Sequence, residues 1–187
     1  MKNIIVAGVG GQGLVLATGI IAQAGFKEGL DVKTNDVVGL SQRGGTVWGT
    51  IRMGEKIYSP NIPNGMGDIL LGMEPLEALR WSYLMKEDST IIMNKKKVYP
   101  TPALLEKEEY PEEEIGKLKE KFKIIEIDAM EEAKAAGNIK AANTILIGLL
   151  AKYLDIKTET WEEVLKNNVP PKAIEENINA FYRGYNY

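Results

Sequence analysis

The residues that could carry chemistry are concentrated in two glycine-rich segments. The first follows a short apolar run, residues 3–7, and places Gly8, Gly10 and Gly13 in a G-x-G-x-x-G array ahead of a helical pattern. Such glycines let the N–H groups of a helix N-terminus approach a pyrophosphate, and the helix dipole favours its negative charge. The motif leaves NAD, FAD, coenzyme A and a purely structural tight turn open. The candidate ligand-binding residues here are Gly8, Gly10, Gly11, Gln12 and Gly13.

The second segment, residues 39–49, places three polar side chains ahead of a glycine pair. The glycines can bring the backbone close to a ligand, and the guanidinium of Arg43 can bind a phosphate or a carboxylate through two hydrogen bonds. Both segments follow neighbouring predicted strands, at the carboxyl ends where open α/β sheets bind ligands. The alternative is a turn that enters a strand, with Arg43 in a surface ion pair. The candidate residues here are Ser41, Gln42, Arg43, Gly44 and Gly45.

Two other polar residues have structural explanations that we favour. Asp36, at the end of the second predicted strand, stands where a ribose-binding acid would sit. We favour the simpler explanation, a loop carboxylate on the way to residues 39–49. Asn143 interrupts an alanine-rich helical run. Because a polar group in apolar surroundings needs a partner, we expect Asn143 to make a structural hydrogen bond to a neighbouring loop.

The composition excludes several classes of function. The chain has neither cysteine nor histidine, so the commonest ligands of zinc and iron–sulfur clusters and the usual nucleophile–base pairs are absent, and we expect no metal site. A net charge of −3 with interspersed signs predicts neither nucleic acid nor a membrane as partner. The N-terminus enters a strand and a glycine turn within about ten residues, too short for a signal peptide, so we expect a cytoplasmic protein.

The hydrophobic pattern predicts an α/β fold, with a Rossmann-like, mostly parallel sheet of five or six main strands and helices on both faces. Residues 3–7, 12–28 and 30–38 read as strand, helix and strand. A β-hairpin insertion is expected from a strand at 46–53, turn residues at 54–56 and a returning strand at 57–58. Continuous apolar runs at 68–73 and 90–93 are typical of buried parallel strands.

Helices are expected to follow at the C-terminus. The helix at 138–154 is hydrophobic over much of its circumference, which predicts packing inside the domain or against a partner. Thr160 and Glu163 form a capping-box pattern at the start of the next helix, and Pro171 lies near the first turn of the last one. We expect a single domain over residues 1–187, with a C-terminal helical extension at about 156–187.

Four runs together resemble a known family. The two glycine-rich segments are followed by the run Asp-Ile-Leu-Leu-Gly-Met-Glu at 68–74 and by Ala-Asn-Thr at 142–144. The combination is similar to the gamma-type domain of 2-oxoacid:ferredoxin oxidoreductases, in particular to the small (beta) subunits of the indolepyruvate type. The likeness runs from residue 1 to about 150, and the Ser-Gln-Arg-Gly-Gly-Thr-Val block makes it specific.

The resemblance implies a subunit that is inactive alone and belongs to a heteromeric enzyme. That enzyme oxidatively decarboxylates an arylpyruvate with coenzyme A as co-substrate, giving an aryl-acetyl-CoA, carbon dioxide and reduced ferredoxin. Thiamine diphosphate and [4Fe-4S] clusters would belong to the large partner subunit, and ferredoxin would be reached through the complex. Residues 10–13 and 41–45 would face the large subunit or coenzyme A. Relatives often place Glu and His where this chain has Asp36 and Val37.

Two other hypotheses stay open on the sequence. One is a stand-alone nucleotide- or flavin-binding module, motivated by the G-x-G-x-x-G array and Asp36. The other is a purely architectural subunit whose glycine array binds nothing. An obligate partner would leave an apolar face exposed on the isolated chain, so self-association as a homodimer stays open too.

Overall fold

The structure is a computed structural model, and it describes residues 1–38, 45–99, 104 and 109–187. Six strands form one sheet in the order β2-β3-β1-β4-β5-β6. Strands β1, β4, β5 and β6 pair in parallel, whereas β3 is antiparallel to both of its neighbours, β1 and β2. The strands are β1 (Lys2–Val9), β2 (Asp31–Val38), β3 (Thr46–Gly54), β4 (Gly67–Gly72), β5 (Met85–Asn94) and β6 (Lys123–Ile127).

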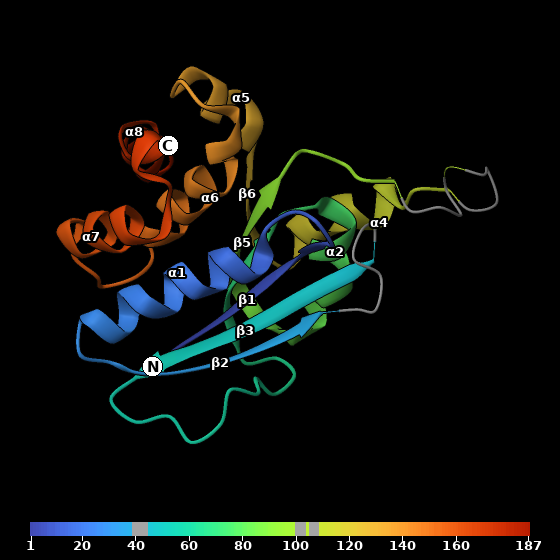
Figure 1. Cartoon of the computed structure of the whole chain (residues 1–187). Helices are drawn as coiled ribbons and strands as arrows, with labels where there is room; N and C mark the ends of the chain where they lie inside the picture. Colours follow the sequence, from blue (N-terminus) through green and yellow to red (C-terminus); the bar gives the residue numbers. More distant parts are fainter. Residues whose placement is uncertain (39–44, 100–103, 105–108) are drawn as a thin grey trace.

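Helices cover both faces of the sheet, as predicted (Figure 1). Because side chains alternate along a strand, β1 sends Ile4 and Val6 into one buried cluster and Ile5 and Ala7 into another. The first cluster is closed by α1 (Leu14–Lys27), α5 (Ala129–Ala135), α6 (Ala142–Ala151), α7 (Thr158–Asn168) and α8 (Ile174–Tyr185). The second is closed by α2 (Pro75–Trp81) and α4 (Glu112–Lys117). Short 3₁₀ helices are Ser82–Leu84, Leu118–Glu120, Ile139–Ala141 and Pro171–Ala173.

Helix α6 is the buried helix that the sequence predicts, since every residue from Thr144 to Ala151 is buried. Its closest neighbour is α8, and glycines on both helices allow the approach. A Cβ on Gly148 would lie 2.1 Å from the Phe181 carbonyl oxygen, and one on Gly184 would lie 1.9 Å from the Ile145 carbonyl oxygen. The two backbones are therefore in direct contact, and neither glycine has room for a side chain.

Residues 156–187, predicted as a helical extension, contribute to the main core. Trp161 of α7 and Phe181 of α8 are both fully buried, with ring centroids 6.0 Å apart. Their cluster also holds the buried faces of α1 and α6. Figure 1 shows α7 and α8 on the same side of the sheet as α1.

The predicted β-hairpin of residues 46–53 and 57–58 is wrong. Residues 57–58 form no strand, and β3 instead pairs with β2, from Asp31 opposite Gly54 to Val38 opposite Val47. The Ile57 N–H donates to the Asp31 carboxylate at 2.8 Å, so this segment crosses the end of the β2–β3 pair instead of extending it. Turn residues after a strand do not reveal which strand pairs with it.

The predicted capping box is also wrong. Helix α7 begins two residues earlier, at Thr158, and no side chain caps its N-terminus. The Thr160 hydroxyl contacts the Glu28 carboxylate at the end of α1 instead. That contact ties α7 to α1, and the hydrogen bond lowers the pKa of Glu28.

Candidate functional site

The two glycine-rich segments meet at the carboxyl edge of the parallel strands. Because β3 is antiparallel, its first residue, Thr46, lies opposite the last residue of β1, Val9. The Gly10 N–H donates to the Gly45 carbonyl oxygen at 2.7 Å, which joins the two segments directly. Four of the predicted site residues, Ser41, Gln42, Arg43 and Gly44, lie outside the described residues.

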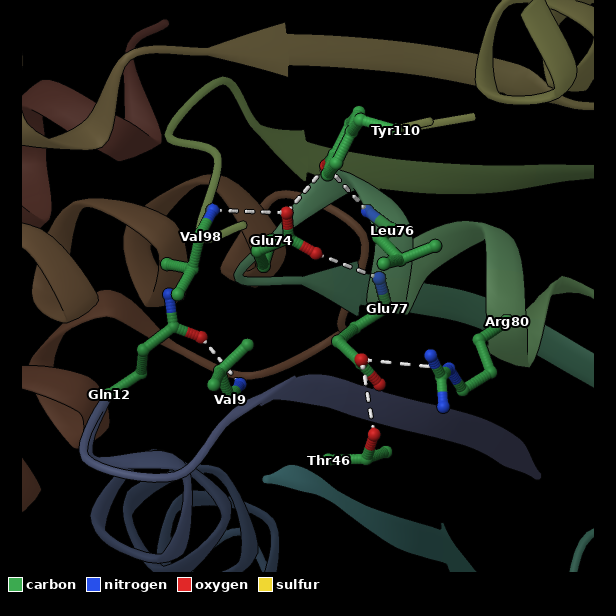
Figure 2. Close-up of polar contacts among 9 residues, drawn as sticks. All are labelled: Val9, Gln12, Thr46, Glu74, Leu76, Glu77, Arg80, Val98 and Tyr110. Carbon is green, nitrogen blue, oxygen red and sulfur yellow. Dashed lines mark hydrogen bonds and ion pairs between the residues drawn. The ribbon is translucent and has the colours of Figure 1, made fainter. Parts of the chain in front are cut away.

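The side chain of Gln12 folds back under the first glycine turn and braces it. Its Oε1 accepts a hydrogen bond from the Val9 N–H at 2.7 Å (Figure 2), and its Nε2 donates to the Met73 carbonyl oxygen at 3.2 Å. A Cβ on Gly8 would lie 2.7 Å from Gln12 Oε1. A side chain at Gly8 would therefore displace the Gln12 amide from the turn.

Asn143 supports the same turn from the start of α6. Its Nδ2 donates to the Gln12 carbonyl oxygen at 2.6 Å, which confirms the predicted structural hydrogen bond to a neighbouring loop. Gly13 has a left-handed backbone with φ of 75°, and a Cβ there would lie 2.9 Å from Asn143 Nδ2. The turn is thus held between β4 and α6 by two amide side chains.

Helix α1 begins at Leu14, with Gly13 as its N-cap and no side-chain cap. In the part of the chain that the structure describes, the N–H groups of residues 13–16 donate no hydrogen bond. Open N–H groups at a helix N-terminus suit an anion. In a dinucleotide fingerprint the third glycine lets the helix pack closely on the strand, whereas Gly13 here is the N-cap that precedes the helix. The second glycine of the fingerprint lets the backbone approach the pyrophosphate, whereas the Gly10 N–H here donates to Gly45. The turn therefore departs from the dinucleotide geometry.

Asp36 has structural partners on the α1 side of the sheet. Strand β3 separates β2 from β1, so Asp36 is not on the strand next to the glycine turn. Its Oδ2 accepts a hydrogen bond from the Thr18 hydroxyl at 3.3 Å, and a Cβ on Gly49 would lie 2.2 Å from its Oδ1. Burial against these groups raises the pKa of Asp36. The favoured structural explanation fits, although the residue belongs to a strand and not to a loop.

Sequence reasoning missed a buried carboxylate at this edge, Glu74. It has no exposed surface, and its carboxylate accepts hydrogen bonds from the Tyr110 hydroxyl at 2.5 Å, the Val98 N–H at 3.2 Å and the Glu77 N–H at 3.0 Å (Figure 2). Three donors offset much of the cost of burying a charge. Burial and then the hydrogen bond to Glu74 raise the pKa of Tyr110. The sequence signal that could have indicated it is an acid directly before a proline. Proline is common at N1 of a helix, so the acid at position 74 takes the N-cap position.

A second buried carboxylate, Glu77, lies one helical turn away and is only 4% exposed. Its Oε1 accepts from the Thr46 hydroxyl at 3.2 Å and lies 3.6 Å from Arg80 Nε (Figure 2). Its Oε2 is buried without a hydrogen-bond partner among the described residues. Burial raises the pKa of Glu77, against the smaller opposing effect of Arg80. Glu77 therefore connects α2 to the first residue of β3, within the second glycine-rich segment.

The site is thus a braced glycine turn at the carboxyl edge of an open α/β sheet. Within the described ranges, no group of three or more His, Cys, Asp or Glu side chains could hold a metal ion. In the same part of the chain, no helix has the length and apolarity needed to cross a membrane. The arrangement can present backbone donors to an anion or to a partner surface.

Comparison with known proteins identifies the family. The model of the pyruvate ferredoxin/flavodoxin oxidoreductase family matches residues 3–187, and the chain belongs to this family. The indolepyruvate oxidoreductase subunit IorB of Archaeoglobus fulgidus is 36% identical over 189 residues, covering 98% of this chain and 94% of the relative. The common gamma subunit of the pyruvate/ketoisovalerate oxidoreductases of Pyrococcus abyssi is 32% identical, covering 92% and 89%. The resemblance to gamma-type subunits is thereby confirmed.

A solved structure has the same fold. The 2-oxoglutarate:ferredoxin oxidoreductase of Magnetococcus marinus, solved with 2-oxoglutarate, coenzyme A and succinyl-CoA bound, aligns with a TM-score of 0.77 at 21% identity. The alignment covers 99% of this chain and 30% of that longer chain. In that protein the fold seen here is one part of a larger polypeptide.

Proposed function

We propose that the chain is the small, cluster-free subunit of a heteromeric 2-oxoacid:ferredoxin oxidoreductase that acts on arylpyruvates, indolepyruvate above all. The reaction is oxidative decarboxylation with coenzyme A to an aryl-acetyl-CoA, carbon dioxide and reduced ferredoxin. One observation carries the proposal: the chain matches an indolepyruvate oxidoreductase subunit over nearly the full length of both proteins. The substrate is the most specific part of the proposal, because gamma subunits that serve pyruvate and ketoisovalerate also match.

The composition agrees with the proposed division of labour between the subunits. A chain with no cysteine and no histidine lacks the side chains that bind iron–sulfur clusters. The resemblance to the family implies that thiamine diphosphate, the [4Fe-4S] clusters and electron transfer to ferredoxin belong to a large partner subunit, and we propose the same division here. The small subunit contributes binding surface and shape to the complex.

The carboxyl edge is the part proposed to face the large subunit or coenzyme A. Residues 10–13 and Gly45 lie there, and residues 41–44 are proposed to face the same ligand or partner. The open N–H groups of residues 13–16 support the binding of a phosphate at this edge. Gln12 and Asn143 keep the turn in one conformation, so these donors are oriented before a ligand arrives. Glu74 fixes the start of α2 beside them.

Reconstitution tests the proposal. The chain is purified alone and with a co-expressed thiamine-binding, cysteine-rich partner, and reduction of ferredoxin is followed under anaerobic conditions. We expect no turnover by the chain alone, and CoA-dependent turnover by the complex that is faster with indolepyruvate or phenylpyruvate than with pyruvate or 2-oxoglutarate. Size-exclusion chromatography of the isolated chain tests self-association in the same preparation.

Three results would contradict the proposal in whole or in part. Turnover by the isolated chain would remove the need for a partner. A tightly held nucleotide or flavin on the isolated chain would favour the stand-alone binding module, for which the open helix N-terminus is the one structural argument. A complex that prefers pyruvate would keep the enzyme class and reject the substrate.

A further inference from the structure

A cleft of about 460 Å³ lies on the α1 side of the sheet, away from the two buried carboxylates of α2. It is bounded by the first turns of α1, by the start of α6 and by the connection from α7 to α8. Its volume falls within the range of about 300–1,000 Å³ that is usual for small-molecule sites. Asn143 lines the cleft and also supports the glycine turn, so the two sites are adjacent.

The floor of the cleft is apolar. Ala17, Ile20 and Ile147 line it, and each is at most 2% exposed. Leu16 adds an apolar wall and is 51% exposed. An apolar body of a ligand would be removed from water on this floor, which favours binding by about 25 cal/mol for each Å² buried.

Charged groups of both signs line the same cleft without partners. Among the described residues, neither Lys140 nor Lys172 makes an ion pair through its ammonium group. Glu176 also lines the cleft, and its Oε2 is buried with no hydrogen-bond partner in the described part of the chain. A desolvated carboxylate oxygen without a donor is costly. A ligand that supplies a donor to Glu176 would recover that cost.

Neighbouring polar groups in the cleft are already paired with each other. The Thr144 hydroxyl donates to Asn177 Oδ1 at 2.6 Å, and Asn177 Nδ2 donates to the Ala173 carbonyl oxygen at 2.7 Å. Ordinary packing thus satisfies the amides and the hydroxyl but leaves both lysines and Glu176 unpaired. The unpaired set is one acid and two cations around an apolar floor.

We propose that this cleft binds an α-amino acid with a large apolar side chain. The ligand ammonium pairs with Glu176, its carboxylate pairs with Lys140 and Lys172, and its side chain lies on Ala17, Ile20 and Ile147. A 2-oxo acid of the same shape leaves Glu176 unpaired, and an amine leaves the lysines unpaired. Glu176 Oε2 is buried, and sites with buried polar groups reject analogues that leave those groups without partners. Lys140 and Lys172 are exposed, so an unpaired lysine costs less.

The biological role of this site rests on the proposed function, because it assumes a 2-oxo acid substrate. The binding of an amino acid in the cleft rests only on the residues that line it. An α-amino acid and a 2-oxo acid differ only in an amino group in place of an oxo group. Transfer of that amino group to a second 2-oxo acid, which becomes an amino acid in exchange, therefore converts the proposed ligand into the proposed substrate. The small subunit would sense the amino acid from which its complex draws the 2-oxo acid.

Isothermal titration of the full chain tests the site. L-phenylalanine, L-leucine and L-tryptophan are the ligands. Phenylpyruvate, which lacks the ammonium, and phenethylamine, which lacks the carboxylate, are the matched controls for phenylalanine. We expect saturable binding of at least one amino acid. Its dissociation constant should be about tenfold or more lower than those of the 2-oxo acid and the amine with the same side chain. Glu176→Gln should weaken this binding about tenfold, whereas Glu175→Gln, a change at an exposed residue in the same turn, should leave it unchanged.

Three outcomes would overturn the proposal. They are absence of saturable binding by any of the three amino acids, phenylpyruvate binding as tightly as phenylalanine, and a Glu176→Gln variant that binds like the unmodified chain. Thermal unfolding of Glu176→Gln checks that the variant is folded. If it is not, Lys172→Gln at an exposed rim position gives the test, and unchanged amino acid binding by that variant overturns the proposal. None of these results affects the reconstitution assay, so the two proposals fail separately.

Discussion

At the scale of single residues, the glycine turn depends on the Gln12 side chain as well as on its glycines. Gln12 contacts the Val9 N–H and the Met73 carbonyl oxygen, and its own carbonyl oxygen accepts from Asn143. The turn is therefore attached to β1, β4 and α6 through a single residue. A position that reads as one variable letter of the G-x-G-x-x-G array is the one that holds the array in shape.

Replacing Gln12 by Met keeps the length of the side chain and removes both of its hydrogen bonds. We expect the free energy of unfolding to fall by about 1–3 kcal/mol, because the Val9 N–H is left without a partner. Urea denaturation measures it. The control is Gln23→Met. Gln23 is exposed and its amide contacts only the Asn168 side chain, so this change should cost under about 0.5 kcal/mol. Equal losses for the two variants would contradict this role of Gln12.

Glu77 gives a pH-dependent prediction. Burial raises its pKa in the folded chain above the ordinary value of 4.5. A raised carboxyl pKa favours folding fully below the unfolded value, and that contribution is lost as pH rises toward the folded pKa. Glu77→Gln has no such loss, so its stability relative to the unmodified chain should increase as pH rises above about 4.5. Urea denaturation from acid to neutral pH measures this difference.

The control for Glu77 is Glu114→Gln, because Glu114 is exposed on α4. Its stability difference from the unmodified chain should stay flat over the same range of pH. A flat difference for Glu77→Gln, or one that shrinks as pH rises, would show that burial does not raise the pKa of Glu77.

At the scale of elements, two glycines explain how closely α6 and α8 cross. Gly148→Ala and Gly184→Ala should each lower the free energy of unfolding by about 1–3 kcal/mol or more, because the added methyl meets backbone that cannot yield. Gly116→Ala is the matched control. It lies exposed in α4 with nothing near its Cβ position, and should stabilise by about 1 kcal/mol. Thermal unfolding compares the three variants, and a neutral Gly148→Ala would refute the close approach.

How far the elements could be predicted depends on whether their signal is local. The apolar runs at 68–73 and 90–93 identified β4 and β5, because strands buried on both faces are apolar throughout. The pairing of β3 with β2 was missed, because the turn residues after Gly54 say nothing about a partner earlier in the chain. Thr160 was misread as a cap, because its hydroxyl contacts Glu28, which is distant in sequence.

The site divides in the same way. The glycine positions and Asn143 were predicted, since motif spacing and a lone polar residue in an apolar helix are visible in one window of sequence. The cluster of Glu74, Glu77 and Tyr110 was not, because its members come from two segments separated by β5 and meet only in the folded chain. Burial of Glu74 depends on donors from Val98 and Tyr110, which no local pattern reveals.

At the scale of the whole molecule, we propose that residues 1–187 form one domain that needs its last two helices. A chain that ends at residue 155 loses Trp161 and Phe181, both fully buried. Loss of each large aromatic side chain costs about 3–5 kcal/mol, against a total stability of about 5–15 kcal/mol. We expect the truncated chain to show no cooperative unfolding transition by circular dichroism. Deletion of residues 186–187 alone is the control, and a folded 1–155 chain would make the helical extension a separate unit.

The assembled enzyme gives the last prediction, which separates an architectural subunit from one that contacts the co-substrate. In the reconstituted complex, Arg43→Ala removes a guanidinium proposed to bind a phosphate of coenzyme A; a charged hydrogen bond of this kind contributes about 1.5–3 kcal/mol. We expect the KM for coenzyme A to rise about tenfold or more, with kcat and subunit assembly unchanged. Lys33→Ala is the control, because Lys33 pairs with Asp31 on the edge strand β2. An unchanged KM for coenzyme A in Arg43→Ala would leave the second glycine-rich segment a purely structural role, whereas loss of assembly would make Arg43 a contact of the partner subunit.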